Sequence, residues 1–408
     1  MSSSSYITII LAGGRGVQLD LLTNETPKSA IIFGGVHRLI DFTLSNCIHS
    51  NVGDIGVVTQ YCGCGLTDYI GCGSKWFPEN GSVRVTMIPP KAGNSISELQ
   101  TGTADALIEN IGFIEKSKPK NILVLSGDQV YKMNYARMMK VHEQSGAVAT
   151  IAAVSVPLAE ASRHNIMISD KNNTIIDYKE RPASPKSYLA SMGVFVFDWV
   201  TLKKHLLEAV SVYKTGLEIS RDIIPAMLTS GERIIAHRHH GYWKDIDNIY
   251  SLWEANMDLL TDSPGVDFQD GDWRIIGRSD VRLVRHETSH LDDAYISDSL
   301  VAEGCVIKGT VSKSVISTDV EVGKDARIID SVIMPGARIG KGAVVLKAIV
   351  GAGATVDDYT AVGGVKPDGR YLDNIRGVSA VGSNASVFTS REGRLKTAAT
   401  SMPESRAV

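Results

Sequence analysis

The sequence predicts two consecutive domains, an α/β domain followed by a parallel β-helix. Apolar runs alternate with amphipathic segments from residue 6 to about residue 260, which is typical of an α/β fold. From about residue 295 an aliphatic residue recurs at every sixth position, which is the signature of a β-helix. A chain of 408 residues has room for two or three domains. We predict the α/β domain at 1–263, a linker at 264–290, the β-helix at 291–388 and a disordered tail at 389–408.

The α/β domain is predicted from its hydrophobic periodicity. Five apolar runs indicate strands: Ile7–Leu11, Gly53–Thr59, Asn121–Leu125, Ala147–Val154 and Met192–Phe197. Three amphipathic segments indicate helices: Thr103–Ile114, Asn134–Gln144 and Ile249–Leu260. This alternation predicts a mostly parallel sheet, in which ligands bind at the carboxyl ends of the strands.

The β-helix is predicted from two runs of regularly spaced aliphatic residues. Its registers are Ile316, Val322 and Ile328, and then Val344, Val350, Val356 and Val362. Each rung buries one aliphatic side chain and stacks on the next rung. Because β-helices need covered ends and take part in assembly, we expect a homo-oligomer. The polar, aperiodic segment after residue 389 is expected to be mobile.

The composition excludes several classes of protein. The formal net charge is −3, which makes no case for nucleic acid or an anionic membrane as a partner. The apolar runs are too short to span a bilayer, and Met1–Ser5 has no feature of a signal peptide. We therefore expect a cytoplasmic protein with no membrane partner.

Cysteine and histidine clusters are weak candidates for metal sites. The five cysteines are an odd and sparse set, which argues against a disulfide framework. Cys62, Cys64 and Cys72 have no fourth ligand at a recognisable spacing, so we interpret them as small residues of a glycine-rich loop. We interpret the histidines at 237, 239 and 240 as part of an exposed strand.

A glycine-rich turn after the first strand is the first candidate for a binding site. Leu11-Ala12-Gly13-Gly14-Arg15-Gly16 follows the apolar run at its carboxyl end. Such a turn presents backbone N–H groups that can bind phosphate. Its spacing fits neither the Walker motif nor the dinucleotide fingerprint, so the turn alone does not define a nucleotide site.

Three charged residues are candidates for phosphate chemistry, each with a structural alternative. Lys28 could neutralise charge on a transferring phosphate group, or it could be a solvated lysine. Asp128 follows the strand Asn121–Leu125 and could hold Mg²⁺, or it could cap the helix that begins near Asn134. Asp245 could be a second Mg²⁺ ligand or a turn residue.

Two further motifs could contact a substrate. Gly102 and Thr103 open a helix whose N-terminus can face an anion or a base. Glu180 and Arg181 could bind sugar hydroxyls and a sugar phosphate, or they could form a surface ion pair of little energetic weight.

Taken together, the motifs resemble the ADP-glucose pyrophosphorylases, or glucose-1-phosphate adenylyltransferases, within the sugar-1-phosphate nucleotidyltransferases. The resemblance extends from about residue 7 into the β-helix. The matching motifs include Leu11-Ala12-Gly13-Gly14-Arg15-Gly16, Arg38-Leu39-Ile40-Asp41-Phe42, Thr59-Gln60-Tyr61, Gly102-Thr103-Ala104-Asp105-Ala106, Ser126-Gly127-Asp128, Ala190-Ser191-Met192-Gly193, Tyr242-Trp243-Lys244-Asp245 and Trp253-Glu254-Ala255-Asn256.

The resemblance implies a Rossmann-like nucleotidyltransferase domain followed by a left-handed β-helix. It implies that an NTP and a sugar 1-phosphate react with Mg²⁺ to give an NDP-sugar and pyrophosphate. The implied nucleotide-binding residues are Leu11, Ala12, Gly13, Gly14, Gly16, Gln60, Gly102 and Thr103. The implied catalytic residues are Lys28, Asp128 and Asp245, of which the two aspartates match metal ligands. The implied substrate-binding residues are Gln100, Asn165, Glu180, Arg181, Ser191 and Gly193.

Several departures from the family pattern fall at substrate positions. Gln18 replaces an arginine that faces the leaving pyrophosphate, so that the charge is lost. Asn165 stands at a family glycine, and Leu217-Glu218-Ile219-Ser220 replaces His-Asp-Phe-Gly. These changes favour a shifted substrate, such as valienol 1-phosphate with GTP, which relatives in aminocyclitol antibiotic pathways use. The alternatives are a plain glucose-1-phosphate adenylyltransferase and an inactive regulatory subunit.

Overall fold

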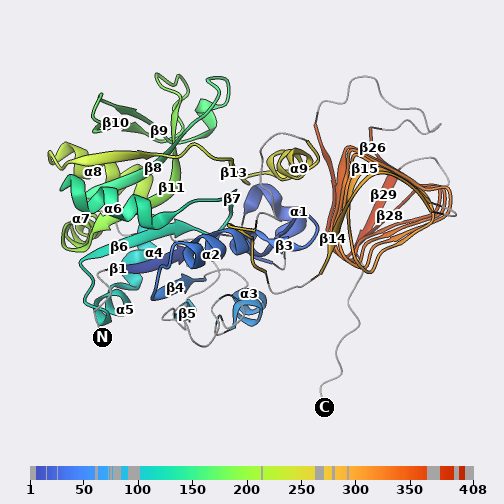
Figure 1. The fold of residues 1–408 in the computed structure, drawn as a ribbon, viewed down its shortest axis with the longest axis horizontal. Helices are drawn as coiled ribbons and strands as arrows, with labels where there is room; N and C mark the ends of the chain where they lie inside the picture. Colours follow the sequence, from blue (N-terminus) through green and yellow to red (C-terminus); the bar gives the residue numbers. More distant parts are fainter. Residues whose placement is uncertain are drawn as a thin grey trace, which may run out of the picture. The chain divides into compact units, whose positions relative to one another are not determined.

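The computed structural model divides the chain into two compact units (Figure 1). It describes residues 6–14, 16–24, 26–59, 63–71, 73, 76, 84–90, 102–212, 215–261, 271–277, 281–291, 294–364, 377–389 and 395–399. The first unit comprises Met1–Gly14, Ile40–Asp245 and Phe268–Ile276, and the second comprises Arg15–Leu39, Ile246–Asp267 and Gly277–Val408. Because the units interleave along the chain, they differ from the consecutive domains that the sequence predicts, and the boundaries at 263 and 290 stay a proposal.

The first unit is built on a nine-stranded sheet. Its strand order is β10-β9-β11-β6-β1-β4-β5, with β8 beside β11 and β12 beside β8. The strands are β1 (Tyr6–Leu11), β4 (Ile55–Val58), β5 (Val85–Ile88), β6 (Asn121–Ser126), β8 (Ala149–Ser155), β9 (Ile166–Ser169), β10 (Ile175–Lys179), β11 (Leu189–Asp198) and β12 (Ile234–Arg238). A separate two-stranded sheet pairs β7 (Gln129–Tyr131) with β13 (Trp243–Asp245).

The sheet is mostly parallel, as predicted, because seven of its nine strands run in one direction and only β10 and β11 run in the other. Strands β1, β4, β5 and β6 run parallel, as the alternating pattern predicts. Strand β11 runs antiparallel to β6, β8 and β9, and β9 runs antiparallel to β10. The C-terminal part of this unit therefore contains antiparallel pairs that the predicted alternation does not include.

Helices cover both faces of the sheet. Within β1, Ile7 and Ile9 pack into one apolar cluster with Leu107 and Leu202, while Ile10 is buried on the opposite face. A strand buried on both faces requires the continuous apolar run seen here. The helices of this unit are α2 (Leu39–His49), α3 (Gly63–Ile70), α4 (Thr103–Glu109), α5 (Ile111–Lys116), α6 (Tyr135–Ser145), α7 (Trp199–Val212) and α8 (Ile224–Thr229).

Local signals define the helix ends. The predicted helix Thr103–Ile114 is two helices, α4 and α5, which meet at Asn110. The Asn110 side chain donates a hydrogen bond to the carbonyl of Ala106 at 2.8 Å and so ends α4. Asn134 caps α6, because its side chain accepts a hydrogen bond from the Arg137 N–H at 3.3 Å.

Part of the predicted linker is bound to the first unit. The Trp273 indole donates a hydrogen bond to the Asn46 side chain on α2 at 2.9 Å. The Ile276 N–H donates to the Ser45 hydroxyl at 2.8 Å. Residues 271–276 therefore pack along α2 instead of forming a free connection.

The second unit contains the β-helix, whose first turn takes 15 residues and whose central turns take 17. Thr310, Arg327, Val344 and Ala361 pair in succession on parallel strands, so each residue lies above the one 17 positions earlier. The strands are β14 (Leu283–Leu291), β15 (Ala294–Ala302), β16 (Val306–Ile307), β17 (Thr310–Ser312), β18 (Val315–Ile316), β19 (Glu321–Val322), β20 (Arg327–Ile329), β21 (Val332–Ile333), β22 (Arg338–Ile339), β23 (Val344–Leu346), β24 (Ala348–Val350), β25 (Thr355–Val356), β26 (Ala361–Gly363), β27 (Ser379–Val381), β28 (Ala385–Thr389) and β29 (Leu395–Ala399).

The core residues of the β-helix are spaced unevenly. The buried aliphatic side chains are Val311, Ile316, Val322, Ile328, Ile333, Ile339, Val345, Val350, Val356 and Val362. Successive steps are therefore five, six and six residues, which is why the sequence displays two registers. The prediction that Val344 points into the core is wrong by one position. Val345 is fully buried, whereas Val344 is only half-buried.

Residues with positive φ turn the chain at the corners of each coil. One corner has Lys313, Asp330 and Lys347, with φ of 46°, 48° and 47°. The other corners have residues at the same 17-residue interval: Asp319, Gly336 and Gly353, and then Asp325, Gly342 and Tyr359. Most of these residues are glycine or short polar residues, which tolerate the left-handed region best.

A ladder of buried serines follows the five-residue corner. The Ser299 hydroxyl accepts a hydrogen bond from the Ser314 N–H, and the Ser314 hydroxyl accepts one from the Ser331 N–H, each at 3.1 Å. The Ser331 hydroxyl accepts one from the Ala348 N–H at 3.2 Å. All three hydroxyls also donate to backbone carbonyls two residues earlier. The ladder therefore pairs backbone groups that the tight corner would leave unsatisfied.

The second unit also contains short elements from elsewhere in the chain. These are α1 (Asp20–Thr23), β2 (Ile32–Phe33), β3 (His37–Arg38) and α9 (Ile249–Asp258). On α9, the Trp253 indole donates a hydrogen bond to the Asp330 carbonyl at 2.6 Å, and the Lys347 ammonium lies 5.1 Å from the indole ring centroid. The motif that contains Trp253 therefore attaches α9 to a corner of the β-helix.

Part of the predicted tail is ordered. Residues Leu395–Ala399, which the sequence places in a disordered tail, form β29 and pair antiparallel with β28. The predicted tail beyond residue 399 lies outside the described residues.

Candidate functional site

The glycine-rich turn begins beside the loop that carries Asp128. The Gly127 N–H donates a hydrogen bond to the Leu11 carbonyl at 3.1 Å, and a Cβ on Gly127 would lie 3.4 Å from the Ala12 Cβ. Both segments leave neighbouring parallel strands at their carboxyl ends, as the register of Leu11 opposite Ser126 shows. Gly13 is half-buried and Gly14 is exposed. The glycine-rich turn and the loop that carries Asp128 therefore lie beside each other at the carboxyl ends of β1 and β6.

The two candidate metal ligands lie close together along one strand pair. Asp245 on β13 is directly opposite Gln129 on β7, and Asp128 immediately precedes Gln129. Opposed Cα atoms of an antiparallel pair lie about 4.5–5.5 Å apart. Both aspartates are half-buried, and the Ser126 hydroxyl donates a hydrogen bond to the Asp128 carboxylate.

The helix-cap alternative for Asp128 is wrong, because Asn134 caps α6. The turn alternative for Asp245 is also wrong, since this residue ends a strand. Asp245 therefore lies in the β7–β13 pair, and Asp128 lies in the loop that joins β6 to β7.

Gln129 is a structural centre of the candidate site that the sequence did not reveal. Its side chain is 6% exposed and accepts a hydrogen bond from the Trp243 indole at 3.2 Å. The His164 ring lies edge-on to Trp243, with 5.3 Å between ring centroids. Only the strand pairing brings Gln129 and Trp243 together, so no local pattern could have predicted the contact.

Two predicted substrate residues lie on β11 beside Gln129. Gly193 has φ of +68°, a conformation that favours glycine, and a Cβ there would lie 3.3 Å from the Gln129 Nε2. The Gly193 N–H donates a hydrogen bond to the Ser191 hydroxyl at 3.3 Å. The pairing of β11 with β8 shifts register between Ser191 and Phe195, and the shift coincides with this glycine.

A buried polar cluster surrounds Tyr178 on β10. Its hydroxyl donates a hydrogen bond to the Ser220 hydroxyl at 3.1 Å. Burial raises the pKa of Tyr178, while hydrogen bonds with Ser220, Ser191 and Asn165 lower it. The Asn165 carbonyl accepts a hydrogen bond from the Ser191 N–H at 2.8 Å. The structure thus brings together Asn165 and Ser191, which the sequence predicted, with Tyr178 and Ser220, which it did not assign to the site.

The Asn165 side chain has an unsatisfied acceptor. Its Oδ1 is buried and has no hydrogen-bond partner among the residues that the structure describes. A buried acceptor without a partner costs free energy, so such atoms mark positions where a donor is expected to bind.

Glu180 and Arg181 are both exposed at the end of β10. Arg181 has φ of +37°, which turns the chain away from the strand. Their contact with a sugar phosphate stays a prediction.

The N-terminus of α4 is occupied by the segment 216–219. The Glu218 carboxylate accepts hydrogen bonds from the Thr103 N–H at 3.1 Å and from the Thr103 hydroxyl. A Cβ on Gly102 would lie 2.0 Å from the Leu217 carbonyl oxygen, so only glycine fits there. The Asp105 carboxylate accepts hydrogen bonds from the N–H groups of Gly102 and Leu217. Thr103 and Gly102 therefore hold this segment in place, and their contact with a nucleotide stays a prediction.

Lys28 and Gly16 belong to the second unit and lie side by side there. Gly16 has φ of +65°, and a Cβ at this position would lie 3.0 Å from the Lys28 Cβ. The Thr23 hydroxyl donates a hydrogen bond to the Gly16 carbonyl at 3.2 Å and closes the turn. Lys28 is half-buried at the start of the 3₁₀ helix Lys28–Ala30, and Gln18 is exposed.

Some of the sequence-predicted site residues cannot be placed. Gln60 and Gln100 lie outside the described residues, as do Cys62 and Cys72. In the described part of the chain, no group of three or more histidine, cysteine, aspartate or glutamate side chains could hold a metal ion. Burial, together with neighbouring histidines, lowers the pKa of His237 and of His239.

Comparison with known proteins identifies the class first. Residues 7–262 match the nucleotidyl transferase family model, so the chain belongs to the nucleotidyl transferase family. Residues 281–371 match the model of the GlmU-like, C-terminal hexapeptide family. These two matches agree with the fold described above, a nucleotidyltransferase unit and a hexapeptide-repeat β-helix.

Curated relatives narrow the assignment further. The chain is 40% identical over 335 residues to the glucose-1-phosphate adenylyltransferase of Clostridium perfringens strain SM101, which covers 82% of this chain and 86% of the relative. It is 44% identical over 275 residues to the enzymes of the same name from Clostridium acetobutylicum and Desulforamulus reducens, covering 67% of this chain and 72% and 69% of these relatives. The protein is therefore a sugar-1-phosphate nucleotidyltransferase. Among the described helices, none is long and apolar enough to cross a membrane.

Proposed function

We propose that the protein transfers a nucleotidyl group from an NTP to a glucose-like sugar or cyclitol 1-phosphate, with a specificity shifted from that of its named relatives. The pair we propose is valienol 1-phosphate with GTP. The observation that carries the proposal is the cluster of Tyr178, Ser220 and Asn165 beside Ser191 and Gly193. Two positions at which the resembled family has glycine, 165 and 220, here supply polar side chains to a single cluster.

The cluster affects recognition through its hydrogen-bonding groups. The Asn165 Oδ1 is a buried acceptor that a substrate hydroxyl could satisfy. A site with such a group discriminates strongly against substrates that lack the matching donor. Compared with a glycine-lined pocket, this cluster therefore changes which ring hydroxyls, and in which orientation, are bound best.

The proposed reaction is an in-line displacement at the α-phosphorus of the NTP. A phosphate oxygen of the sugar 1-phosphate forms the new P–O bond, while the bond to the pyrophosphate breaks. Negative charge accumulates on the leaving pyrophosphate, so cationic groups near it lower the barrier. We propose Lys28 as one such group and the N–H groups of the Leu11–Gly16 turn as a cradle for the nucleotide phosphates.

We propose that Asp128 and Asp245 hold Mg²⁺, and the donor set fits this ion. Mg²⁺ is typically bound by one or two carboxylates together with substrate phosphates and water. Asp245 on β13 and Asp128, in the loop just before β7, provide two half-buried carboxylates. When bound, the ion would neutralise phosphate charge. The Ser126 hydroxyl, which donates to Asp128, would orient that carboxylate.

Two alternatives each rest on a specific observation. Synthesis of ADP-glucose from ATP and glucose 1-phosphate is favoured by the names of the relatives. An inactive regulatory subunit is favoured by Gln18, because an amide there lacks the charge of an arginine facing the leaving group. Lys28, Asp128 and Asp245 argue against inactivity, because all three charged groups are present. We also propose a homo-oligomeric, cytoplasmic protein.

The direct test is pyrophosphate release by the purified protein with Mg²⁺, for four NTPs against glucose 1-phosphate and valienol 1-phosphate. We expect the highest kcat/KM for valienol 1-phosphate with GTP. The Asn165→Gly/Ser220→Gly variant should shift the ratio of kcat/KM values toward glucose 1-phosphate by at least about tenfold. A preference for ATP with glucose 1-phosphate in the wild type would establish the first alternative instead.

The metal ligands are tested in the same assay. Asp128→Asn and Asp245→Asn should each lower kcat by about 10³-fold, because each removes a negative ligand at the site of phosphate transfer. Asp177→Asn is the matched control, since Asp177 forms an exposed ion pair with Lys179. If no substrate pair gives release in the wild type, the regulatory-subunit alternative stands.

A further inference from the structure

Helix α2 and the residue that follows it carry three buried polar side chains on one face. Thr43, Asn46 and Ser50 are spaced by three and four residues, so they lie in line along the helix. Thr43 and Asn46 are fully buried, and Ser50 is 5% exposed. Buried polar side chains need hydrogen-bond partners, since an unpaired polar group costs free energy. We call these three residues the polar stripe.

The two ends of the polar stripe bind the backbone of one segment, residues 126–135. The Thr43 hydroxyl donates a hydrogen bond to the Ser126 carbonyl at 2.8 Å. The Ser50 hydroxyl accepts one from the Tyr135 N–H at 2.8 Å. The segment runs from the end of β6 to the start of α6 and contains the first of the two aspartates that we propose as Mg²⁺ ligands. This segment is therefore fixed to α2 at both ends.

Asn46 fixes the middle of the segment and uses the whole hydrogen-bonding capacity of its amide. Its Nδ2 donates to the Tyr131 carbonyl at 3.1 Å and to the Tyr135 hydroxyl at 3.5 Å. Its Oδ1 accepts from the Met133 N–H at 3.0 Å and from the Trp273 indole at 2.9 Å. An amide has two N–H donors and two acceptor lone pairs, whereas a carboxylate of the same size has no donor. An aspartate at this position would therefore lose the contact with the Tyr131 carbonyl.

One peptide unit of the segment is held from two sides. Its carbonyl, from Ser126, accepts the hydrogen bond of Thr43. Its N–H, from Gly127, donates to the carbonyl of Leu11, the first residue of the glycine-rich turn, at 3.1 Å. The Ser126 hydroxyl in turn donates to the Asp128 carboxylate. The orientation of this one peptide therefore sets where Asp128 lies relative to the start of the turn.

We propose that Thr43 and Asn46 are positioning residues for nucleotidyl transfer, because they hold Asp128 in place relative to the glycine-rich turn. This inference rests on the proposed function, in which Asp128 holds Mg²⁺ and the turn binds the nucleotide phosphates. Mg²⁺ contacts both its protein carboxylates and the substrate phosphates, so these must be kept at a fixed separation. Ser50 contacts the far end of the segment, where α6 begins, and is not part of this arrangement.

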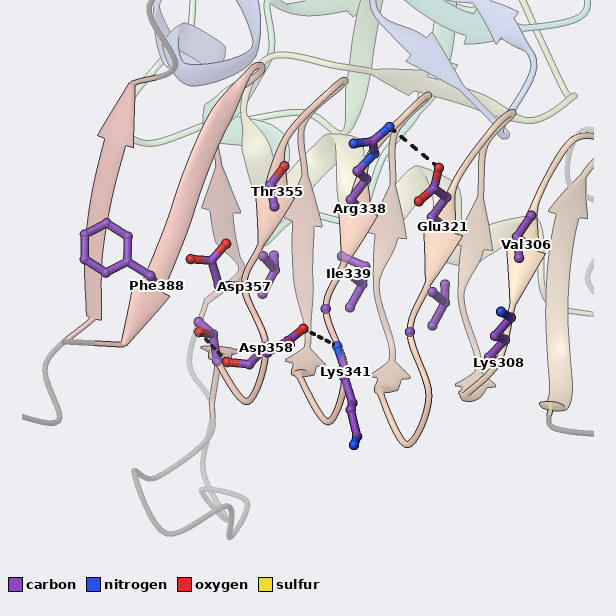
Figure 2. Close-up of a pocket in the computed structure, with 15 residues that line it drawn as sticks. Val306, Lys308, Glu321, Arg338, Ile339, Lys341, Thr355, Asp357, Asp358 and Phe388 are labelled. Carbon is purple, nitrogen blue, oxygen red and sulfur yellow. Dashed lines mark hydrogen bonds and ion pairs between the residues drawn. The ribbon is translucent and has the colours of Figure 1, made fainter. Parts of the chain in front are cut away.

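Burial distinguishes these bonds from side chain–backbone hydrogen bonds at the surface. On an open groove of the β-helix, the Lys341 N–H donates to the Asp358 carboxylate at 2.7 Å (Figure 2). Water can replace an exposed acceptor of this kind at little cost. Thr43 and Asn46 are fully buried, so water cannot replace their side-chain groups unless the segment moves. We therefore expect their loss to displace the segment.

The test compares two substitutions in the full-length protein, each of which removes one buried hydroxyl bonded to the segment at 2.8 Å. Thr43→Val keeps the side-chain shape and loses the bond to Ser126, whereas Ser50→Ala loses the bond to Tyr135. Both variants should unfold at similarly lowered temperatures, because each leaves one backbone group unpaired. Only Thr43→Val should lower kcat, by about tenfold, with the KM for the sugar 1-phosphate changed by less than about threefold. Thr43→Ser, which restores the hydroxyl, should bring kcat back to within about threefold of the wild type.

Metal binding is measured without turnover, by titrating each protein with Mn²⁺ and following the EPR signal of the free ion. Asp128→Asn should weaken the binding most, because it removes a negative ligand. Thr43→Val should weaken it by at least about fivefold, since groups that orient a ligating carboxylate change metal affinity about 10–100-fold. Ser50→Ala should bind Mn²⁺ as the wild type does.

Asn46 is tested by Asn46→Asp, which keeps the acceptor for Met133 and loses both donors. It should lower kcat at least about tenfold. Trp273→Phe is the control, because it removes only the indole bond, which comes from outside the segment. Its kcat should stay within about twofold of the wild type. Equal kcat values for these two variants would overturn the role of Asn46.

The outcomes separate this inference from the proposed function. Mn²⁺ binding that is unchanged by Asp128→Asn would overturn the metal assignment itself, and the positioning role with it. If Asp128→Asn weakens Mn²⁺ binding while Thr43→Val and Ser50→Ala behave alike, the metal assignment stands and the positioning role is overturned. A kcat that Thr43→Ser does not restore would also overturn it, because the hydroxyl would then not be the group that matters.

Discussion

The two units of this protein bring distant residues together in different ways. In the first unit, Leu11, Gly127, Gln129 and Gly193 come from separate strands and meet through pairings of unrelated sequence separation. In the central coils of the β-helix, each strand residue pairs with the residue 17 positions away, and the same corner recurs from one coil to the next. The candidate site is therefore formed where the pairings are irregular in sequence separation. The stabilising contacts recur where the pairings follow a regular interval. Four changes test this contrast, beginning with the largest expected effect.

A polar substitution should destabilise the β-helix strongly only at positions whose side chains point into the core. Val345→Asn should lower the free energy of unfolding by about 3–5 kcal/mol, because it buries an amide and removes packing in the core. Val344→Asn, one residue away and half-buried, should cost less than about 1 kcal/mol. Denaturant unfolding followed by circular dichroism measures both. Equal effects at 344 and 345 would show that the assigned register is incorrect.

The serine ladder should contribute the next largest effect. Ser331→Ala leaves the buried Ala348 N–H without its acceptor, at a cost of about 1–3 kcal/mol. Thr355→Ala on β25 is the control and should stay within about 0.5 kcal/mol of the wild type. The same unfolding assay applies. A Ser331→Ala variant as stable as the control would mean that the ladder does not stabilise the corner.

The attachment of α9 should contribute less. Trp253→Phe keeps an aromatic ring but loses the hydrogen bond to the Asp330 carbonyl, at a cost of about 1 kcal/mol. Tyr250→Phe on the same helix removes an exposed hydrogen bond to Glu254 and should change the free energy of unfolding by only a few tenths of a kcal/mol. Calorimetry of the three proteins compares their Tm values, and reversal of this order would contradict the assigned role of Trp253.

The smallest effect concerns pH and distinguishes the first unit from residues 294–364 of the β-helix. Burial lowers the pKa of His142, which contacts the Thr150 hydroxyl at 2.9 Å, whereas residues 294–364 contain no histidine. Because the unfolded chain binds the proton more tightly, this contribution to stability is present above pH 6.5 and is lost as pH falls below that value. His142→Gln should therefore reduce the loss of Tm between pH 7 and pH 5. An unchanged loss would exclude His142 as a source of the pH dependence.

The regular unit was also the easier one to predict from sequence, with one instructive exception. A repeat of six identifies a β-helix, yet a single five-residue step at each turn moved Val345, not Val344, into the core. The step depends on a tight corner whose carbonyl and N–H groups are satisfied by serines. The predicted tail shows the same limit, because the pairing of β29 with β28 depends on a partner strand rather than on local pattern.

In the first unit, the sequence predicted the strands that precede the candidate site better than the contacts between its side chains. The strands before the glycine turn and before Asp128 were predicted, since each is a continuous apolar run. The contacts of Gln129 with Trp243 and of Tyr178 with Ser220 span 114 and 42 residues, so no periodicity reports them. Thr103 was expected to face a ligand, but its N–H binds Glu218, which lies 115 residues away.

The 17-residue turn also makes the length of the β-helix adjustable in whole steps. Duplicating residues 327–343 would insert one complete coil, keep every core residue inward and lengthen the stack by about 4.8 Å. An insertion of 18 residues would instead point every later aliphatic side chain toward solvent, because neighbouring residues of a strand face opposite sides. The number of coils can therefore vary between related chains without redesign of the fold, and the length of the β-helix would vary with it.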